Sequence, residues 1–259
     1  AQPGQPLVLE GEDLVLLAIE LDGRALVAGE YAYDGRELRL PDPGRACRLR
    51  TRVRIRPDAN TRLEGLYQSG KLLLTQCEAQ GFRRITFMAD RPDVMPRWRI
   101  TLRADRAAYP VLLANGNPVS NRALEGGRHE AVWENPHPTP AYLFAIAAGA
   151  LGRVTSTVRT AEGREVELNI WAEPGDVERC RYALGAVERS LRWDEQRFGR
   201  CYDLDVFNVV AAQDFTMGAM ENKGLNIFNA RYILADEATA TDADFLAIES
   251  VVAHEYLHN

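Results

Sequence analysis

Long apolar runs and closely spaced cysteines are both missing from this sequence of 259 residues. No stretch approaches the roughly 18 apolar residues that a membrane-spanning helix needs, so we expect no membrane partner. No basic segment followed by an apolar one marks a signal peptide, and four cysteines without a C-x-x-C pair favour free thiols in a reducing compartment. We therefore expect a cytoplasmic protein, although a first residue that is not Met leaves open a removed leader.

Lysine is also scarce, because Lys71 and Lys223 are the only two in the chain. This bias indicates a GC-rich coding sequence and says nothing about function. The formal net charge of −6 argues against nucleic acid as the main partner. A hydrophobic content of 46% and a charged content of 26% are typical of a soluble globular protein.

The first part of the chain is predicted to be rich in β-strands. Residues 48–55 alternate arginine with Thr51 and Val53, which predicts a half-buried strand with a charged outer face and not a nucleic-acid site. We find no convincing helix before residue 150. Further strands are expected at residues 14–21, 31–33, 83–88, 98–104 and 129–133. Short strands at this spacing predict a sandwich or saddle-like sheet.

A proline-rich connector at residues 135–140 predicts a domain boundary near residue 150. We therefore expect an N-terminal β domain over residues 1–150 and a second domain over residues 151–259. In the second domain a helix is expected to open at Pro174 and stop at Gly199. Strands are expected at residues 154–159, 165–171, 202–211 and 224–230. This order of elements predicts the first part of an α+β hydrolase domain.

The most informative feature is the pattern H-E-x-x-H, formed by His254, Glu255 and His258. Thr241 and Asp244 form a capping box before an apolar run, which predicts a largely buried helix that ends in the motif. Residues four apart on a helix lie about 40° apart around its axis, so both imidazoles can reach one metal ion. Glu255 can hold and deprotonate a metal-bound water, as in zinc hydrolases.

The alternative is a chance match in which two core histidines are hydrogen-bonded. H-E-x-x-H arises by chance in roughly one chain in a hundred of this length. A buried helix with two histidines and a glutamate needs partners for those polar groups, which favours the metal. A catalytic zinc also needs a third protein ligand, and no residue after Asn259 is present to supply it.

A second pattern, G-A-M-E-N, occupies residues 218–222. In isolation such a string indicates a surface turn with a solvated glutamate. An extended edge at this place can instead pair with a peptide as an added strand. Glu221 can then face the positive α-amine at the end of that peptide.

The two patterns together resemble the aminopeptidase N family of zinc metallopeptidases (gluzincins), and its bacterial alanyl aminopeptidase branch in particular. The similarity is carried by residues 213–229, with L-Y-Q-S-G at 66–70, Q-C-E-A at 76–79 and D-R-P-D-V at 90–94. It covers residues 63–259 and is weaker over residues 1–62. The resemblance implies a β N-terminal domain followed by the first part of an α+β thermolysin-like catalytic domain.

The resemblance implies a role for each motif residue at the reaction centre. His254 and His258 are expected to bind Zn²⁺, and Glu255 is expected to act as the general base. Glu221 is expected to anchor the α-amine of the substrate.

The resemblance also implies further contacts to the substrate. Gln76 and Glu78, expected on one face of a strand, supply a second anchor for the α-amine. By itself a Gln-x-Glu pair is typical of a solvated strand face. Gly218 and Ala219 are expected to contact the peptide backbone, and Met220 to form a wall of the first side-chain pocket.

The expected activity is removal of N-terminal residues from peptides with a free N-terminus. The family's third zinc ligand and a tyrosine that stabilises the oxyanion would follow Asn259, so we expect an inactive excerpt cut at both ends. One alternative is a bifunctional relative of the leukotriene-type epoxide hydrolases, and another is a noncatalytic binding module. The sequence does not give the side-chain preference or the oligomeric state, for which a monomer is the default expectation.

Overall fold

The computed structural model describes residues 4–259, which divide into two compact units. Unit 1 contains the residues up to Tyr67, Thr75–Pro96 and Thr139–Tyr142. Unit 2 contains Gln68–Leu74, Arg97–Pro138 and Leu143–Asn259. Each unit therefore combines segments that are distant in the sequence. These units are not continuous in sequence, so they do not test the predicted domain boundary near residue 150, which stays a prediction.

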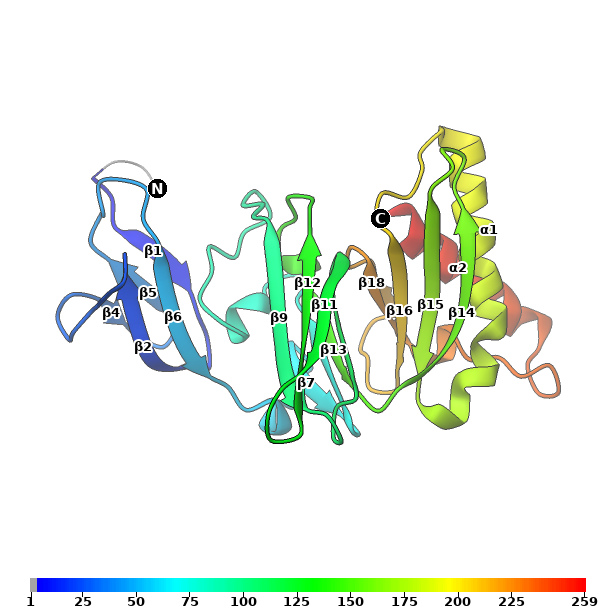
Figure 1. Cartoon of the computed structure of the whole chain (residues 1–259), viewed down its shortest axis with the longest axis horizontal. Coiled ribbons are helices and arrows are strands. Elements are labelled where there is room, and N and C mark those ends of the chain that lie inside the picture. The colour runs from blue at the N-terminus through cyan, green and yellow to red at the C-terminus, as the bar shows by residue number, and fades with distance from the viewer. Residues whose placement is uncertain (1–3) are drawn as a thin grey trace. The chain divides into compact units, whose positions relative to one another are not determined.

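Unit 1 contains two three-stranded antiparallel sheets (Figure 1). Their strand orders are β1-β5-β4 and β3-β2-β6, with β1 (Leu7–Glu10), β2 (Val15–Leu21), β3 (Arg24–Ala25), β4 (Ala32–Tyr33), β5 (Glu37–Leu40) and β6 (Leu49–Arg54). The arginines of β6 are exposed while Thr51 and Val53 are partly buried, which confirms the predicted half-buried strand. Leu38, Leu40 and Phe87 are among the residues that form the core of this unit.

The strand predicted at residues 83–88 is wrong, because Phe82–Arg84 forms a short 3-10 helix instead. Arg83 donates to the carboxylate of Asp90 from its backbone N at 3.2 Å and from Nε at 3.0 Å, which favours a turn over extended backbone. An added Cβ at Gly81 would lie 2.4 Å from the carbonyl oxygen of Gln76, so only glycine permits this close return of the chain.

Unit 2 contains a three-stranded sheet of order β11-β12-β9, with β9 (Trp98–Asp105), β11 (Asn117–Ala123) and β12 (Arg128–Asn135). It also contains most of a four-stranded sheet of order β10-β13-β8-β7, with β7 (Gly65–Ser69), β8 (Leu72–Gln76), β10 (Val111–Ala114) and β13 (Ile146–Gly149). The strands predicted at residues 98–104 and 129–133 are confirmed as β9 and β12.

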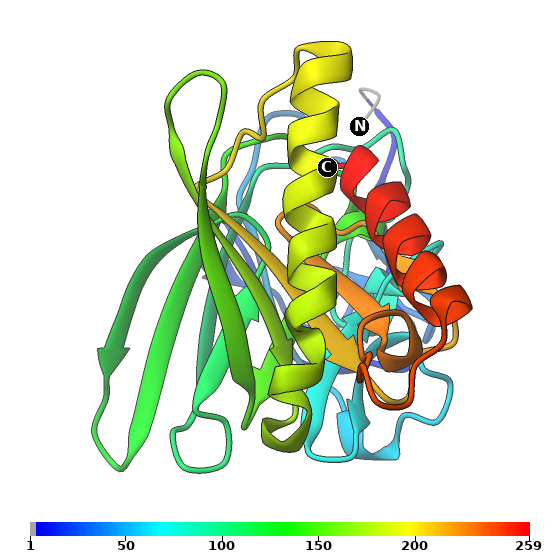
Figure 2. The same ribbon diagram turned by 90° about the vertical axis from the view of Figure 1, so that its right-hand side faces the viewer.

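A five-stranded sheet of order β14-β15-β16-β18-β17 carries the C-terminal part of unit 2. Its strands are β14 (Gly152–Arg159), β15 (Glu165–Ala172), β16 (Val206–Ala212), β17 (Ala219–Met220) and β18 (Leu225–Asn229). The central pairs β15–β16 and β16–β18 are parallel, and the two outer pairs are antiparallel. Helices α1 (Arg181–Phe198) and α2 (Asp242–Leu257) lie side by side over one face of this sheet (Figures 1 and 2).

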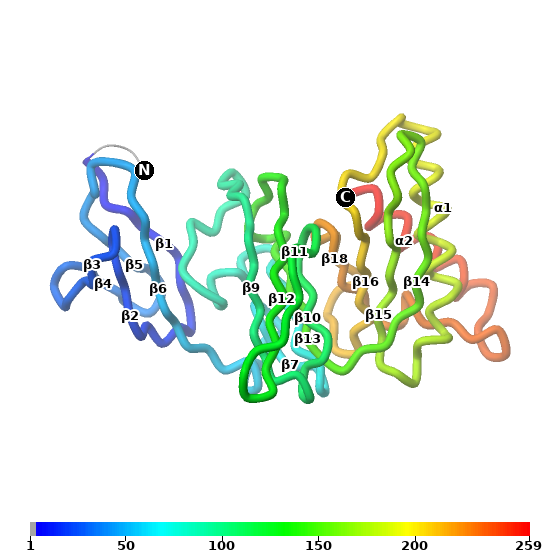
Figure 3. The backbone as a smooth tube through the Cα atoms, viewed as in Figure 1, coloured from blue at the N-terminus to red at the C-terminus, as the bar shows by residue number. Residues whose placement is uncertain are grey.

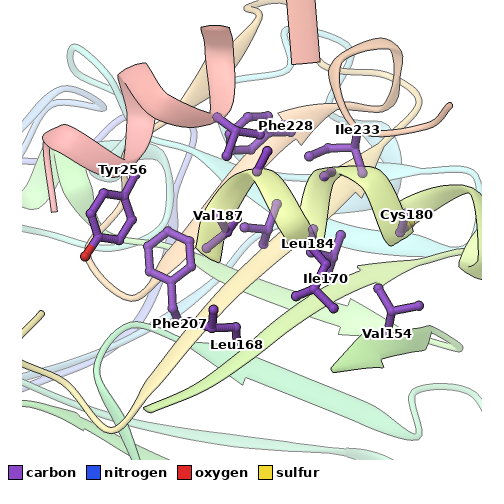
Figure 4. Packing of buried hydrophobic residues seen from close by; sticks show 14 of the residues in the cluster. Val154, Leu168, Ile170, Cys180, Leu184, Val187, Phe207, Phe228, Ile233 and Tyr256 are labelled. Carbon is purple, nitrogen blue, oxygen red and sulfur yellow. The ribbon is translucent and has the colours of Figure 1, made fainter. Parts of the chain in front are cut away.

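The core between helices and sheet is apolar and closely packed. Leu168 and Ile170 of β15 and Phe207 of β16 meet Leu184 and Val187 of α1 in this core (Figure 4). Burying such side chains contributes about 1.5–3 kcal/mol each, which holds the helices on the sheet.

Of the two predicted ends of the first helix in this unit, the start is shifted and the stop is confirmed. The segment Pro174–Cys180 is a 3-10 helix, and α1 begins only at Arg181. Gly152 of β14 leaves room for this tight segment, since an added Cβ would lie 2.6 Å from Cγ2 of Val177. Gly199 ends α1 in the left-handed region with φ of 65°, which confirms the predicted stop.

The strand expected from residue 202 begins at Val206, because the hydroxyl of Tyr202 donates to the carbonyl of Val206 across a loop. The remaining short 3-10 helices are Pro57–Ala59, Ala141–Leu143 and Ala230–Tyr232. Over residues 4–259, no helix is both long and apolar enough to cross a membrane.

Candidate active site

Helix α2 begins with the capping box that the sequence predicts. The backbone N of Asp244 donates to the hydroxyl of Thr241 at 3.3 Å, and the backbone N of Thr241 donates to the Asp244 carboxylate at 2.8 Å. The carboxylate of Asp244 accepts from the backbone N of Thr241 and also from its hydroxyl at 2.8 Å, and these two hydrogen bonds lower the pKa of Asp244 below its usual value. These capping hydrogen bonds hold the first turn of α2, which precedes the apolar residues that pack on the sheet.

One face of α2 is buried and packs against the sheet. Ile248, Val252 and Tyr256 recur at helical spacing and are 0–2% exposed. The Tyr256 ring packs on Phe207 of β16 with ring centroids 5.6 Å apart, and burial raises the pKa of Tyr256. The prediction of a largely buried helix is wrong for the opposite face, where Leu246 is 67% exposed in this chain.

The H-E-x-x-H residues lie at the end of α2, with the glutamate on the buried side and both histidines on the exposed side. The side chain of Glu255 is 6% exposed. The Nε2 atoms of His254 and His258 lie 3.3 Å apart, and the two rings are 4.9 Å apart at their centroids. The one-turn spacing therefore brings the two imidazole nitrogens together on the exposed side of the helix, while Glu255 lies on its buried side.

This donor set fits one half of a tetrahedral metal site. Two nitrogen ligands at about 2.0–2.1 Å from a tetrahedral zinc ion lie roughly 3.3–3.4 Å apart, which matches the Nε2 separation. A hydrogen bond between the two rings would have a similar length, and it requires one ring to donate. In the part of the chain that the structure describes, no group of three or more His, Cys, Asp or Glu side chains is arranged to hold a metal ion.

The G-A-M-E-N segment forms the outermost strand of the five-stranded sheet. Ala219 and Met220 of β17 pair with Phe228 and Ile227 of β18, and the backbone N of Asn229 donates to the carbonyl of Gly218. Since β17 is the terminal strand in the sheet order, its outer edge faces no strand among residues 4–259. The extended edge predicted from the sequence is thus present.

The turn that follows β17 is held in place from several directions. Gly224 has φ of 75°, and an added Cβ would lie 2.8 Å from Cδ1 of Leu204 and 3.1 Å from the backbone N of Gly116. The side chain of Asn115 donates to the carbonyl of Lys223 at 3.0 Å. Glu221, directly before this turn, is partly exposed, while Met220 is fully buried.

Two asparagines near the motifs were not singled out by the sequence. Asn222 is 1% exposed, and neither its Nδ2 nor its Oδ1 has a hydrogen-bond partner within residues 4–259. A buried amide without partners is costly, so Asn222 is an exception among the buried polar side chains of this region. Asn259 links the end of α2 to the turn at Gly224 through its side chain. Asn222 is the last residue of the G-A-M-E-N pattern but has no expected role of its own, and no periodicity or motif marks Asn259.

Gln76 and Glu78 belong to unit 1. The expectation that they share one face of a strand is wrong, because β8 ends at Gln76 and Glu78 lies in the turn that follows. Gln76 is buried and its Nε2 donates to the carbonyl of Glu78 at 3.5 Å, whereas Glu78 is exposed. The turn arises because the backbone N of Gly81 donates to the carbonyl of Cys77.

Two family models match this chain. Residues 22–143 match the peptidase M1 N-terminal domain, and residues 182–259 match the peptidase family M1 domain. The predicted domain boundary at residue 150 falls between the two matched segments.

Sequence comparison and structure comparison agree with these matches. The chain is 52% identical over 255 residues to aminopeptidase N of Caulobacter vibrioides and 47% identical over 254 residues to aminopeptidase N of Escherichia coli. Each alignment covers 98% of this chain and 29% of the relative. The structure of Legionella pneumophila aminopeptidase A in complex with aspartic acid superposes with a TM-score of 0.93 at 31% identity, over 98% of this chain and 30% of that one. The chain thus spans less than a third of the length of these proteins.

Proposed function

Because the chain belongs to the peptidase M1 family, with a β-rich N-terminal domain followed by the start of the catalytic domain, we propose that the complete gene product is a zinc-dependent aminopeptidase. It would remove N-terminal residues from peptides that have a free α-amine. The observation that carries this proposal is the pair of imidazole nitrogens of His254 and His258, which lie 3.3 Å apart on a helix turn that also contains the buried Glu255.

His254 and His258 would hold the zinc ion through their Nε2 atoms. When bound, zinc supplies a Lewis acid that polarises the scissile carbonyl and lowers the pKa of a bound water. The capping box and the buried face of α2 hold the helix backbone that carries the two exposed rings.

Glu255 would act as the general base and then as the proton donor to the leaving amine. Its carboxylate lies one residue after His254 on the buried side of the helix, and 6% of the residue is exposed. A carboxylate held in this way can take a proton from water and deliver it to the amine nitrogen within one active site.

The outer edge of β17 would bind the peptide as an added strand. Gly218 and Ala219 would contact its backbone, and Met220 would form part of the wall of the first side-chain pocket. Glu221 would pair with the α-ammonium group. An internal peptide bond offers no such cation, and leaving a partly buried carboxylate without one is costly, which would exclude blocked peptides.

Gln76 and Glu78 would supply a second set of acceptors for the α-ammonium group. This role rests on the match of residues 22–143 to the family's N-terminal domain and on the exposed carboxylate of Glu78. We also propose a cytoplasmic location, because the four cysteines of the chain are unpaired, as is usual in a reducing compartment. The inactivity expected for the 259-residue chain by itself stays a prediction.

The direct test is hydrolysis of alanyl-p-nitroanilide and N-acetylalanyl-p-nitroanilide by the complete gene product. We expect cleavage of the free amine alone, loss of activity with a zinc chelator, and recovery when zinc is added back. Absence of cleavage with zinc bound would refute the proposal and favour an epoxide hydrolase of the leukotriene type or a noncatalytic protein.

A further inference from the structure

We propose that Asn259 is a positioning residue that fixes the amine-anchoring Glu221 relative to the metal-binding end of α2. The proposal rests on the proposed function, because it concerns how two parts of that one site are held together. Both parts belong to unit 2 of the structure. Figure 3 shows the path of the backbone from β18, which follows the G-A-M-E-N segment, to α2, which contains the H-E-x-x-H residues near its end.

The side chain of Asn259 connects the helix to the turn after β17. Its Oδ1 accepts from the backbone N of Gly224 at 3.1 Å, and its Nδ2 donates to the carbonyl of Glu255 at 2.9 Å. Longer contacts run from Nδ2 to the carbonyl of Glu221 at 3.4 Å and to Oδ1 of Asn226 at 3.5 Å. An amide has two N–H donors, so one hydrogen serves Glu255 and the other is shared between the longer contacts.

The helix end of this link involves the general base itself. The last carbonyls of an α-helix have no partner within the helix, and the carbonyl of Glu255 is one of them. Asn259 satisfies this carbonyl, and its backbone N donates to the carbonyl of Tyr256 at 3.0 Å. The last turn of α2 is therefore held where His254 and His258 project.

The turn end of the link is rigid. Asn226 is fully buried and its Nδ2 donates to the carbonyl of Asn222 at 3.1 Å, while the backbone N of Leu225 donates to the same carbonyl at 2.9 Å. Any displacement of the turn is thus transmitted along the backbone to Glu221, the residue directly before Asn222.

The turn also has an anchor that does not depend on α2. Asn115 is 2% exposed, donates to the carbonyl of Lys223 at 3.0 Å, and accepts from the backbone N of Ala145 at 2.6 Å. Removal of the Asn259 side chain therefore leaves the turn folded but uncoupled from the helix. The expected effect is a loss of alignment between Glu221 and the metal, with the fold retained.

A misalignment of about 1 Å at a reacting centre can cost on the order of 100-fold in rate. For Asn259→Ala in the complete gene product we expect kcat/KM for alanyl-p-nitroanilide to fall by about 10–100-fold, the range found for lost second-shell partners of a metal site. Zinc content should stay equal to that of the wild type. Asn121→Ala is the matched control, because Asn121 lies exposed on β11 and should leave kcat/KM unchanged.

Inhibition by two hydroxamates separates positioning from a general loss of structure. Alanine hydroxamate carries both a metal-chelating group and an α-ammonium group, and propionohydroxamate carries only the chelating group. Asn259→Ala should weaken inhibition by alanine hydroxamate by about 10-fold or more and leave inhibition by propionohydroxamate unchanged. Only alanine hydroxamate needs Glu221 and the metal to be aligned. Equal weakening of both inhibitors, or of neither, would overturn the proposal.

Two further variants and one metal-free measurement keep the test decisive. Asn259→Ser retains one donor and one acceptor and should recover part of the activity, whereas Asn259→Asp places a carboxylate against two carbonyls and should not. Hydrogen exchange of the metal-free protein should show faster exchange of the Gly224 amide in Asn259→Ala than in the wild type. Unchanged exchange, or a failure of all three variants to fold, would refute the positioning role. An inactive wild type would instead refute the proposed function.

Discussion

The Nε2 atoms of His254 and His258 lie 3.3 Å apart at the exposed end of α2. This distance matches the separation of two nitrogen ligands on a tetrahedral zinc ion, and it follows from their one-turn spacing on a capped helix. The capping box and the packing of the buried face stabilise α2, and the helical spacing of α2 sets the separation of the two histidines.

Replacing either histidine of the H-E-x-x-H motif should weaken zinc binding without unfolding the protein. For His258→Ala in the complete gene product we expect zinc affinity to fall more than about 100-fold, the upper limit for a lost second-shell partner. The histidine His137 lies outside the motif, so His137→Ala should retain zinc. Equilibrium dialysis with zinc analysis measures both, and an unchanged affinity in His258→Ala would exclude this residue as a ligand.

The charge of Glu221 should be needed for recognition of the free amine. Glu221→Gln keeps the size of the side chain and removes its charge, so KM for alanyl-p-nitroanilide should rise by about 10-fold or more, the range of a charge-assisted hydrogen bond. Glu237→Gln, at an exposed position, is the control. Steady-state kinetics identical to those of the wild type would rule out the anchoring role.

The two faces of α2 should respond differently to truncation. Ile248 is fully buried, so Ile248→Ala should destabilise the protein by about 2–5 kcal/mol. Leu246 is 67% exposed in this chain, so Leu246→Ala should change stability by no more than about 0.5 kcal/mol. Calorimetric melting temperatures of the 259-residue chain separate the two, and similar losses would contradict the assigned helix orientation.

The capping box should contribute a pH-dependent part of the stability of α2. Hydrogen bonds from the backbone and side chain of Thr241 lower the pKa of Asp244. The stabilisation is therefore complete above the unfolded value of about 3.9 and is lost as the pH falls through the lower folded value. Asp244→Asn should lower the melting temperature at pH 7, and this difference should shrink towards pH 3. A difference independent of pH would contradict the role of the charge.

Much of the fold follows from local patterns in the sequence. Alternation identified β6, and the capping box identified the start of α2, because both patterns depend on neighbouring residues alone. The segment at residues 83–88 was assigned wrongly because its conformation depends on Asp90 and on the close return at Gly81. Contacts of this kind are set by tertiary structure and leave no periodic signal.

The candidate site also contains residues that local patterns identify and residues that only tertiary contacts identify. The H-E-x-x-H residues could be found from the sequence because of helix spacing, and the G-A-M-E-N residues because of the resemblance to a known family. The partition of Gln76 and Glu78 into a buried and an exposed residue depends on where β8 ends. The contacts of Asn259 join residues that are far apart in the sequence, so only the folded chain identifies them.

The account is tested most directly by the products that the complete gene product releases from a peptide with a free N-terminus. Mass spectrometry of the wild type and of Glu255→Gln, compared at equal zinc content, measures both the site of cleavage and the need for the base. We predict a ladder of peptides shortened from the N-terminus by the wild type, at a rate about 10²–10⁴ times that of Glu255→Gln. Internal cleavage, or equal rates in the two proteins, would contradict the account.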